Sequence, residues 1–365
     1  MEFGQGALED MGLTDFWQGR RVFVTGHTGF KGAWLCLWLE RLGACVSAVA
    51  LAPGTSPSLY NILSPWTGAD HHIGDIRDAA ALAAHLKRSE PEIVIHMAAQ
   101  ALVRRSYEDP SDTYSTNVMG TVSLLDAVRE APSVRTVLVV TSDKVYANDG
   151  RGRAFGESDP LGGADPYSSS KACTELVCGS YAKSFLRERG VVLATVRAGN
   201  VIGGGDWGKD RLVPDFVRAL DRGIPVQLRY PEAVRPWQHV LEPLGGYLTF
   251  AQALTNGDKA EGLPDALNFG PDSQDFATVA ELAEELGHGF GISHAWERAP
   301  GEWRPEASVL MLNSALAGDV LGWHPRLDRR QTIEWTAAWY KAYRDGADMR
   351  DFTLRQIAAY EEART

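Results

Sequence analysis

The sequence predicts an α/β fold in which helices cover both faces of a doubly wound parallel sheet. Short apolar runs alternate with longer amphipathic stretches through the first 200 residues or so. The apolar runs are continuous and rich in β-branched residues, which is typical of strands buried on both faces. The joints between the runs are short, as expected for right-handed βαβ units.

The predicted elements follow one another in order along the first half of the chain. Strands are expected at 20–26, 44–51, within 68–75, and at 92–99, 135–142 and 191–198, and helices at 30–43, 79–88, 113–130 and 167–189. Beyond about residue 200, glycine, proline, tryptophan and arginine become dense. This change predicts a smaller, loop-rich region above the carboxyl edge of the sheet, where open α/β sheets bind their ligands.

Composition excludes several classes of protein. The 365 residues have a net charge of −11, with 44% apolar and 23% charged residues, so the chain is globular and acidic. An acidic surface disfavours nucleic acid as a partner, and no apolar run approaches the ~20 residues of a membrane span. The first residues show no signal-peptide pattern, and the four cysteines show no metal-ligand spacing. We therefore expect a cytoplasmic location, no membrane partner and no metal.

A glycine-rich turn predicts a phosphate site. The segment Gly26-His27-Thr28-Gly29-Phe30-Lys31-Gly32 follows the first strand and opens the first helix. In this context the glycines permit a tight turn, close approach to a pyrophosphate and close packing of helix on sheet, while the helix N-terminus attracts the phosphates. The acidic residue usual about 20 positions later is missing, so this motif leaves NAD and NADP open. Asp75 and Ile76 are expected near an adenine, although Asp75 could instead be a turn or cap residue.

A tyrosine and a lysine one helical turn apart predict acid–base chemistry. Tyr167 and Lys171 are four residues apart and share a helix face. The ammonium group is expected to lower the pKa of the phenol, so that a phenolate takes a hydroxyl proton while hydride leaves the adjacent carbon. Thr141 and Ser142 end the preceding strand, and Ser142 is expected to hydrogen-bond the substrate oxygen or Tyr167.

Taken together, these motifs resemble the extended short-chain dehydrogenase/reductases that act on nucleotide sugars. Within that family, the resemblance is strongest to the CDP-glucose 4,6-dehydratase subgroup, and it runs from about Trp17 to the C-terminus. It rests on the stretches VFVTGHTGFKGAWL, IHMAAQALVRRSY, TNVMGT, VTSDKVY, DPYSSSK, VRAGNVIGGGDW and RPWQHVLEPL. It implies a Rossmann-like NAD-binding domain over 17–200, to which about 237–270 return. A tail over 1–16 and a mainly nucleotide-sugar-binding region over 201–365 complete the expected organisation.

The resemblance also implies roles for individual residues. The pyrophosphate of NAD lies on 26–32, and Tyr167 is the base for the sugar 4-hydroxyl, while Lys171 also binds the nicotinamide ribose. The remaining residues expected at the cofactor are Asp75, Ile76, Ala98, Ala99, Gln100, Asn117 and Thr141. Those expected at the substrate are Gln100, Arg104, Ser142, Asn200, Arg211, Arg235 and His239, where His239 could equally serve packing. Arginine suits a diphosphate because its guanidinium matches phosphate bidentately.

The implied reaction is a dehydration with internal redox: oxidation at C4, loss of water across C5 and C6, and hydride return to C6. NAD is expected to stay tightly bound throughout. Asp143 is the candidate acid for the 6-hydroxyl, which requires a raised pKa. Lys144 could be the C5 base, or it could only pair with Asp143. The dTDP-glucose dehydratases have an Asp-Glu pair here, so Asp143-Lys144 departs from the wider pattern and agrees with the subgroup.

Three alternatives stay open from the sequence. The substrate could be a dTDP- or GDP-linked sugar, since only subgroup resemblance favours CDP-glucose. A nucleotide-sugar 4-epimerase or simple oxidoreductase would need Tyr167 and Lys171 but no acid–base pair at 143–144. A non-enzymatic NAD sensor is disfavoured because both residues are present. The amphipathic stretches 113–130 and 167–189 are the helices that form a four-helix homodimer interface in the family, so a homodimer is expected.

Overall fold

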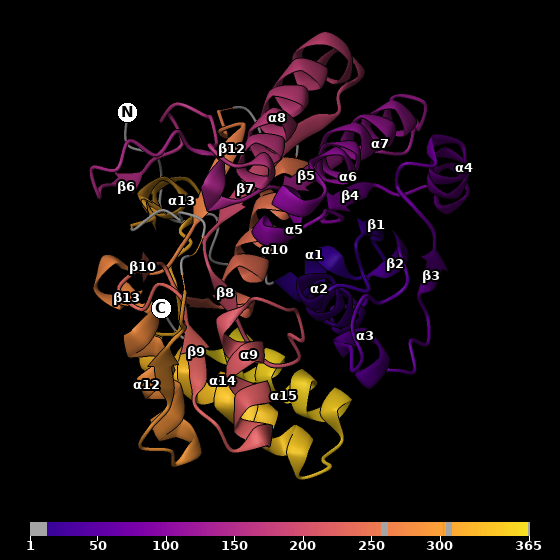
Figure 1. Cartoon of the computed structure of the whole chain (residues 1–365). Coiled ribbons are helices and arrows are strands. Elements are labelled where there is room, and N and C mark those ends of the chain that lie inside the picture. Colours follow the sequence, from indigo (N-terminus) through magenta and orange to yellow (C-terminus); the bar gives the residue numbers. More distant parts are fainter. Residues whose placement is uncertain (1–12, 257–261, 302, 304–308, 364–365) are drawn as a thin grey trace.

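A seven-stranded parallel sheet forms the centre of the molecule (Figure 1), in the strand order β12-β7-β5-β4-β1-β2-β3. The structure is a computed structural model that describes residues 13–256, 262–301, 303 and 309–363. The strands are β1 (Arg21–Thr25), β2 (Cys45–Ala50), β3 (Asp70–Ile73), β4 (Ile93–His96), β5 (Thr136–Val140), β7 (Val192–Ala198) and β12 (Ala266–Phe269). Every pairing between neighbours is parallel. The predicted fold class is confirmed.

Helices bury both faces of this sheet, which is why its strands read as continuous apolar runs. Alternate residues of β1 enter different cores: Val22 and Val24 join one hydrophobic cluster, and Phe23 joins the other. The first face is covered by α1 (Leu13–Trp17), α2 (Phe30–Arg41), α10 (Leu241–Thr255) and α15 (Met349–Glu362). The second is covered by α4 (Ala79–Ser89), α7 (Gly120–Arg129) and α8 (Pro166–Tyr181).

The chain reverses its winding direction beside β1. It runs outward from β1 through β2 to β3, then returns to β4 on the other side of β1. Crossovers on the two sides of this point leave opposite faces, so the loops at the carboxyl ends of β1 and β4 diverge and open a crevice.

Two long helical stretches flank the sheet, as predicted, but neither is a uniform α-helix. The stretch 110–129 consists of α6 (Pro110–Tyr114), the π-helical turn η1 (Ser115–Met119) and α7. The stretch 166–189 consists of α8, the π-helical turn η3 (Ala182–Leu186) and the 3-10 turn η4 (Arg187–Arg189). A π turn inserts one residue into the helical repeat, which the apolar spacing alone does not indicate.

The remaining elements lie mostly in the second half of the chain. Helices are α3 (Leu59–Ile62), α5 (Val103–Glu108), α9 (Leu212–Arg222), α12 (Val279–Phe290), α13 (Ala315–Leu321) and α14 (Arg329–Arg344), with 3-10 turns η2 (Asp143–Val145) and η5 (Ser273–Asp275). Short strands pair in twos: β6 (Ala154–Phe155) with β15 (Met311–Leu312), β8 (Val201–Ile202) with β11 (Gln238–His239), β9 (Val226–Leu228) with β14 (Trp296–Arg298), and β10 (Val234–Arg235) with β13 (Ala277–Thr278). Helix α10 packs on the main sheet and β12 forms its edge strand, although both come from the second half of the chain. The chain therefore passes more than once between the sheet and the loop-rich region. The predicted domain division stays a prediction.

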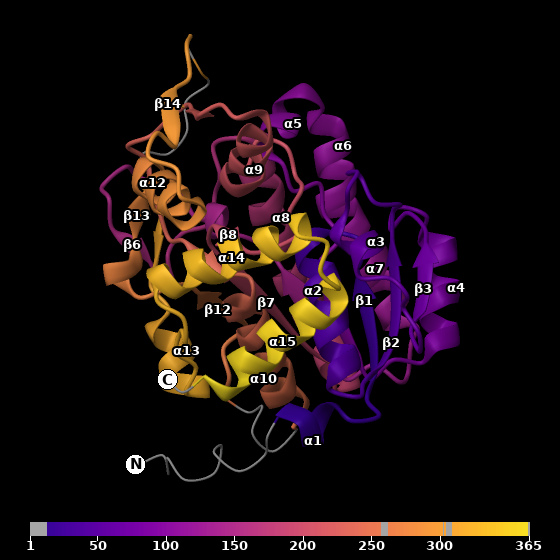
Figure 2. The same cartoon turned by 90° about the horizontal axis from the view of Figure 1, so that it is seen from below.

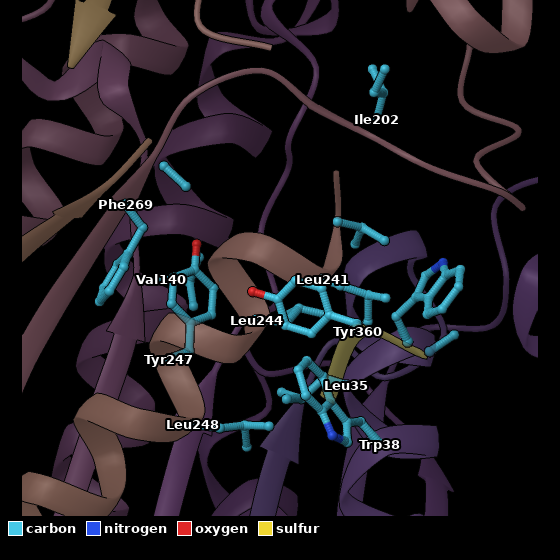
Figure 3. Close-up of a cluster of buried hydrophobic side chains, with 14 of the residues drawn as sticks. Leu35, Trp38, Val140, Ile202, Leu241, Leu244, Tyr247, Leu248, Phe269 and Tyr360 are labelled. Carbon is cyan, nitrogen blue, oxygen red and sulfur yellow. The ribbon is translucent and has the colours of Figure 1, made fainter. Parts of the chain in front are cut away.

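The C-terminal helices α14 and α15 lie on the underside of the molecule and contact each other, and α15 also contacts α2 (Figure 2). Figure 3 shows Trp38 of α2, Leu244 of α10 and Tyr360 of α15 in one cluster of buried side chains. The Tyr360 hydroxyl donates to Oε2 of Glu242 at 2.8 Å, and burial raises the pKa of that carboxyl to about 7. This cluster anchors the chain's last helix to its first βα unit.

One sequence expectation about the ends of the chain needs correction. The tail predicted over 1–16 lies in part outside the described residues, but its last four residues belong to α1. Phe16 is buried there beside the fully buried Trp17, and their rings meet edge to face. The folded chain therefore starts before residue 17. Among the described residues, none of the helices combines the length and apolar character that crossing a membrane requires.

Candidate functional site

A cavity of about 1550 Å³ opens at the carboxyl edge of the sheet. Its wall includes the ends of β1, β2, β4, β5 and β7 together with residues of α9, β9 and β10 from the second half of the chain. This volume exceeds the ~300–1,000 Å³ of a site for one small ligand. It is large enough for a dinucleotide and a nucleotide sugar side by side.

The glycine-rich turn forms a cradle that a side chain would fill. Gly26 has φ +84°, and a Cβ on it would lie 2.7 Å from the backbone nitrogen of Ala98. A Cβ on Gly32 would lie 2.1 Å from the carbonyl oxygen of Gly26. The N-cap of α2 is Gly29, which offers no side-chain cap, so first-turn N–H groups remain for a ligand. These features fit the pyrophosphate of a dinucleotide at the N-terminus of a helix.

Asp75 and Ile76 also line the cavity, and their contact with an adenine stays a prediction. Both Asp75 oxygens accept hydrogen bonds from the Arg77 guanidinium, which holds the pKa of Asp75 below its usual range. Arg77 also donates to Asp112 at 2.8 Å. The backbone at Leu51, after β2, is fixed by Thr28, whose hydroxyl donates to its carbonyl at 2.8 Å.

Tyr167, Lys171 and Ser142 come together in the cavity wall. Asp165 caps α8 by accepting the Ser168 N–H at 3.0 Å, which places Tyr167 in the first turn. The expectation that Lys171 lowers the pKa of Tyr167 is wrong for this structure. Burial raises the pKa of Tyr167 to about 12, against the opposing effect of a hydrogen bond with Ser142.

Lys171 is directed at the backbone instead of the phenol. Its Nζ donates to the carbonyl oxygen of Val140 at 3.0 Å, at the end of β5. Burial lowers the pKa of Lys171 to about 8. An ammonium group fixed at this point joins α8 to the strand that presents Ser142 and Asp143.

Asp143 and Lys144 follow Ser142 in the 3-10 turn η2. The Ser142 hydroxyl donates to Oδ1 of Asp143 at 3.0 Å, and Nζ of Lys144 lies 3.5 Å from the same oxygen. Oδ2 of Asp143 is buried and has no hydrogen-bond partner in the described structure. An unpartnered buried oxygen costs about 1–3 kcal/mol, and because Asp143 belongs to the cavity lining, this oxygen is a candidate to interact with a ligand. The arrangement can exchange protons with a bound sugar.

Side chains predicted to contact the substrate also line the cavity. Arg211 donates to Asp206 at 3.0 Å, and Arg104 donates to Asp210 at 2.6 Å. Arg235 lines the same wall and donates to the carbonyl of Val234 at 2.9 Å. Oδ1 of Asn200, also in the wall, is buried without a hydrogen-bond partner in the described structure. A concentration of guanidinium groups here suits a diphosphate.

Four of the predicted contact residues pack behind the cavity lining. Asn117 accepts the Gln100 N–H at 2.8 Å and donates to the Gln100 carbonyl at 3.1 Å. These two bonds hold the end of the 98–100 loop from behind. His27 lies against the His71 ring at 4.5 Å, and burial lowers the pKa of His27 to about 3. His239 is fully buried between aromatic rings. Direct ligand contact by these four stays a prediction.

The other predicted residues line the cavity: Thr28, Gly29, Phe30, Lys31, Ala98, Ala99 and Thr141. Nζ of Lys31 donates to the hydroxyl of Tyr247 at 3.0 Å, and burial lowers the pKa of Lys31 to about 7. Sequence reasoning missed Trp303, which lines the cavity and stacks with Arg104, because no motif marks it. It also missed Glu175 and Arg197, a buried ion pair behind the wall. An arginine inside an otherwise apolar strand was the available signal for that pair.

Comparison with known proteins agrees with this geometry. Residues 22–270 match the profile of the NAD dependent epimerase/dehydratase family. A CDP-glucose 4,6-dehydratase of Salmonella typhimurium is 48% identical over 358 residues, covering 96% of this chain and 99% of the relative. The solved structure of a dTDP-glucose 4,6-dehydratase double mutant from Streptomyces venezuelae, with NAD bound, matches with TM-score 0.77 and 26% identity, covering 90% of this chain and 99% of the other.

A UDP-glucose 4-epimerase of Thermus thermophilus in complex with NAD matches with TM-score 0.75 and 26% identity, covering 88% of this chain and 99% of the other. The profile match spans the sheet from β1 to β12, including the glycine turn, Tyr167 and Lys171. Fold, cavity and sequence agreement lead to one conclusion: the chain belongs to the NAD dependent epimerase/dehydratase family.

Proposed function

We propose that this chain is an NAD-dependent hydro-lyase that converts CDP-D-glucose to CDP-4-keto-6-deoxy-D-glucose. The 48% identity to a CDP-glucose 4,6-dehydratase over nearly the whole chain supports the substrate. The observation that carries the reaction type is the buried, unpartnered Oδ2 of Asp143 beside Lys144, in the same wall as Tyr167 and Lys171. An epimerase or simple oxidoreductase has no use for a second acid–base pair next to the first.

The first step is oxidation at C4 of the sugar. Bound NAD would supply the hydride acceptor at C4 and the hydride donor at C6, and its cationic ring would favour the phenolate form of Tyr167. Tyr167 then takes the proton of the 4-hydroxyl, while Lys171 orients the site from its place on Val140. The new 4-ketone acidifies the proton at C5.

The second step is loss of water. Lys144, as the free amine, takes the C5 proton, and protonated Asp143 gives a proton to the departing 6-hydroxyl. Lys144 returns its proton to C5 when C6 is reduced. After one turnover, Tyr167 carries one proton more than at the start and Asp143 carries one fewer. Ser142 is hydrogen-bonded to both residues, so it lies on the path that resets them.

Cationic and polar side chains of the cavity lining would bind the substrate. Arg211, Arg235 and Asn200 line the cavity, and in this proposal they hold the CDP diphosphate. Arg104 and its hydrogen-bond partner Asp210 line the same cavity. Because the protein is acidic overall, local guanidinium groups are what attract a dianionic substrate.

The experiment is incubation with CDP-glucose, dTDP-glucose and GDP-mannose in separate reactions, first without and then with added NAD. The readout is a product lighter by one water, with the alkali-induced ultraviolet absorbance of a 4-keto-6-deoxy sugar. Turnover of CDP-glucose supports the proposal, and turnover before NAD is added supports tight cofactor retention. Dehydration of another sugar nucleotide alone would refute the substrate. Reaction without loss of water would refute the acid–base roles and favour an epimerase.

We also propose a homodimer formed by the helices of 110–129 and 166–189. These two stretches lie side by side (Figure 1) and contact each other. Four large hydrophobic side chains on them are exposed: Tyr114, Met119, Leu176 and Phe185. A second copy would bury this patch in a four-helix interface. A cytoplasmic location also stays a prediction, which cell fractionation tests.

A further inference from the structure

A buried ion pair behind the cavity is bonded to both ends of the segment that contains Ser142, Asp143 and Lys144. Glu175 lies on α8 and Arg197 on β7. Their contact is bidentate, with Nε to Oε1 at 2.8 Å and Nη2 to Oε2 at 2.9 Å. Both side chains are buried, with 4% and 5% of their surface exposed.

At one end of the segment, the pair holds Thr141. The Thr141 hydroxyl donates to Oε1 of Glu175 at 2.5 Å, and the Thr195 hydroxyl donates to Oε2 at 2.6 Å. With the two guanidinium bonds, every acceptor position of the Glu175 carboxylate is occupied. Thr141 directly precedes Ser142, so the start of the segment is fixed to α8.

At the other end, the pair holds Tyr146. Nη1 of Arg197 donates to the Tyr146 hydroxyl at 2.8 Å, and that hydroxyl donates to Oδ1 of Asn268 on β12 at 2.7 Å. The Tyr146 ring also stacks on Phe155, with centroids 5.1 Å apart. Tyr146 follows Lys144 by two residues. Both ends of a six-residue segment are thus bonded to one ion pair.

Neither charged side chain lines the cavity, so neither reaches the substrate. Burying two charges is costly, and well-packed apolar residues often serve stability equally well. The bonds to Thr141 and Tyr146 give the pair another use. They set where the segment sits relative to α8, the helix that presents Tyr167 and Lys171.

We propose that Glu175 and Arg197 are positioning residues for the elimination of water, acting through Thr141 and Tyr146. This inference rests on the proposed dehydration. C4 is oxidised at Tyr167, while C5 and C6 react at Asp143 and Lys144, on one sugar ring that cannot shift between steps. The spacing between the two groups must therefore be fixed by the protein.

Removal of this constraint should slow elimination more than oxidation. Tyr167 and Lys171 are held by α8 and by the bond from Lys171 to Val140, independently of Tyr146. Displacing a reacting group by about 1 Å can cost up to ~100-fold in rate. Tyr146→Phe removes only the hydroxyl that fixes the far end of the segment, and it leaves the ion pair intact.

The test is a single turnover with NAD-loaded enzyme in excess over CDP-glucose. Near-ultraviolet absorbance of reduced NAD rises as C4 is oxidised and falls after water is lost. We expect Tyr146→Phe to slow the fall at least about tenfold and to change the rise less than about twofold. If the Glu175→Gln variant folds, it should show the same change in the two phases more strongly. If it does not fold, Tyr146→Phe alone tests the proposal.

Tyr360→Phe is the matched control, because it also removes a buried hydroxyl that donates to a side-chain oxygen, here Oε2 of Glu242, and neither of these two residues lines the cavity. It should leave both rates unchanged. A merely structural role for Tyr146 would reduce the amplitude of the reduced-NAD transient without changing its rates, and this outcome would overturn the proposal. Equal slowing of the rise and the fall would overturn it as well. If the wild-type protein neither reduces NAD nor loses water with CDP-glucose, the proposed function fails and the inference fails with it.

Discussion

His96 lies at the centre of a hydrogen-bond chain that requires it to be neutral. The Thr25 hydroxyl oxygen accepts the N–H groups of Met97 and Ala98, both at 3.1 Å, so its hydrogen points at Nδ1 of His96, 2.6 Å away. On the other side, the Thr121 hydroxyl donates to a backbone carbonyl and so accepts from Nε2 of His96 at 3.1 Å. A proton on Nδ1 would face a hydroxyl hydrogen. Burial lowers the pKa of His96 to about 3, in agreement with this chain.

The free energy of unfolding should therefore depend on pH, and the size of this dependence can be calculated. The unfolded chain binds a proton at this histidine below about pH 6.5, whereas the folded chain does not until about pH 3. The contribution of the neutral His96 to the unfolding free energy is therefore fully present above pH 6.5 and falls as the pH drops below that value. Between pH 7.5 and 5.5 one such histidine removes about 1.4 kcal/mol of unfolding free energy. His27 and His239, whose pKa values burial also lowers to about 3, should each remove a similar amount.

The perturbation is His96→Asn, which keeps an acceptor and a donor but cannot titrate. Urea unfolding at pH 7.5 and 5.5 without NAD, followed by tryptophan fluorescence and far-ultraviolet circular dichroism together, gives the loss of stability between the two pH values. We expect that loss to be smaller in the variant by about 1.4 kcal/mol. Any pH-independent cost of the substitution cancels in this difference. His294→Asn, at an exposed surface position, is the control. Equal losses in His96→Asn and wild type would refute the neutral, buried histidine.

Three further predictions concern cofactor, chemistry and assembly. Gly32→Ala should weaken NAD binding at least about tenfold in a fluorescence titration, since its Cβ would meet the Gly26 carbonyl and overpacking typically costs about 1–3 kcal/mol; Gly54→Ala, with open space around it, should bind normally. Tyr167→Phe should lower kcat by about 10²–10⁴ and abolish reduction of NAD by CDP-glucose in the stopped-flow assay, and an undiminished transient would contradict its role as base. Leu176→Glu should yield monomers in sedimentation equilibrium; a dimer that persists would place the interface elsewhere.

The fold could be predicted from the sequence because its main signals are local. Strands buried on both faces give continuous apolar runs, so β1 and β5 were located to within one or two residues. The π turns η1 and η3 were not predicted, because apolar spacing does not reveal a residue inserted into the helical repeat. The early start of the folded chain at α1 was missed because Phe16 and Trp17 become core residues only through contact with distant helices.

The candidate site was predictable where residues adjoin a strand end and unpredictable where they meet through space. The glycine turn, Ser142 and Asp143 follow strands directly, and they line the cavity. The pKa of Tyr167 was misjudged because spacing indicates which groups share a helix face but not how deeply they are buried. In this structure the desolvation of the phenol decides its pKa, because the Lys171 ammonium group is hydrogen-bonded to the Val140 carbonyl and not to the phenol.

Two buried carboxyl groups, Asp143 just after β5 and Glu175 on α8, differ in how many hydrogen bonds they accept, and this difference separates a supporting role from a chemical one. Glu175 receives four hydrogen bonds and has no capacity left, so it can only hold its neighbours in place. Asp143 keeps one oxygen without a partner, although burying it so costs about 1–3 kcal/mol. A carboxyl group that must give a proton to a substrate needs an oxygen that is free of hydrogen bonds from the protein. If protein donors occupied every position, they would have to be displaced at each turnover. The saturated carboxylate therefore stabilises the position from which the unsaturated one reacts.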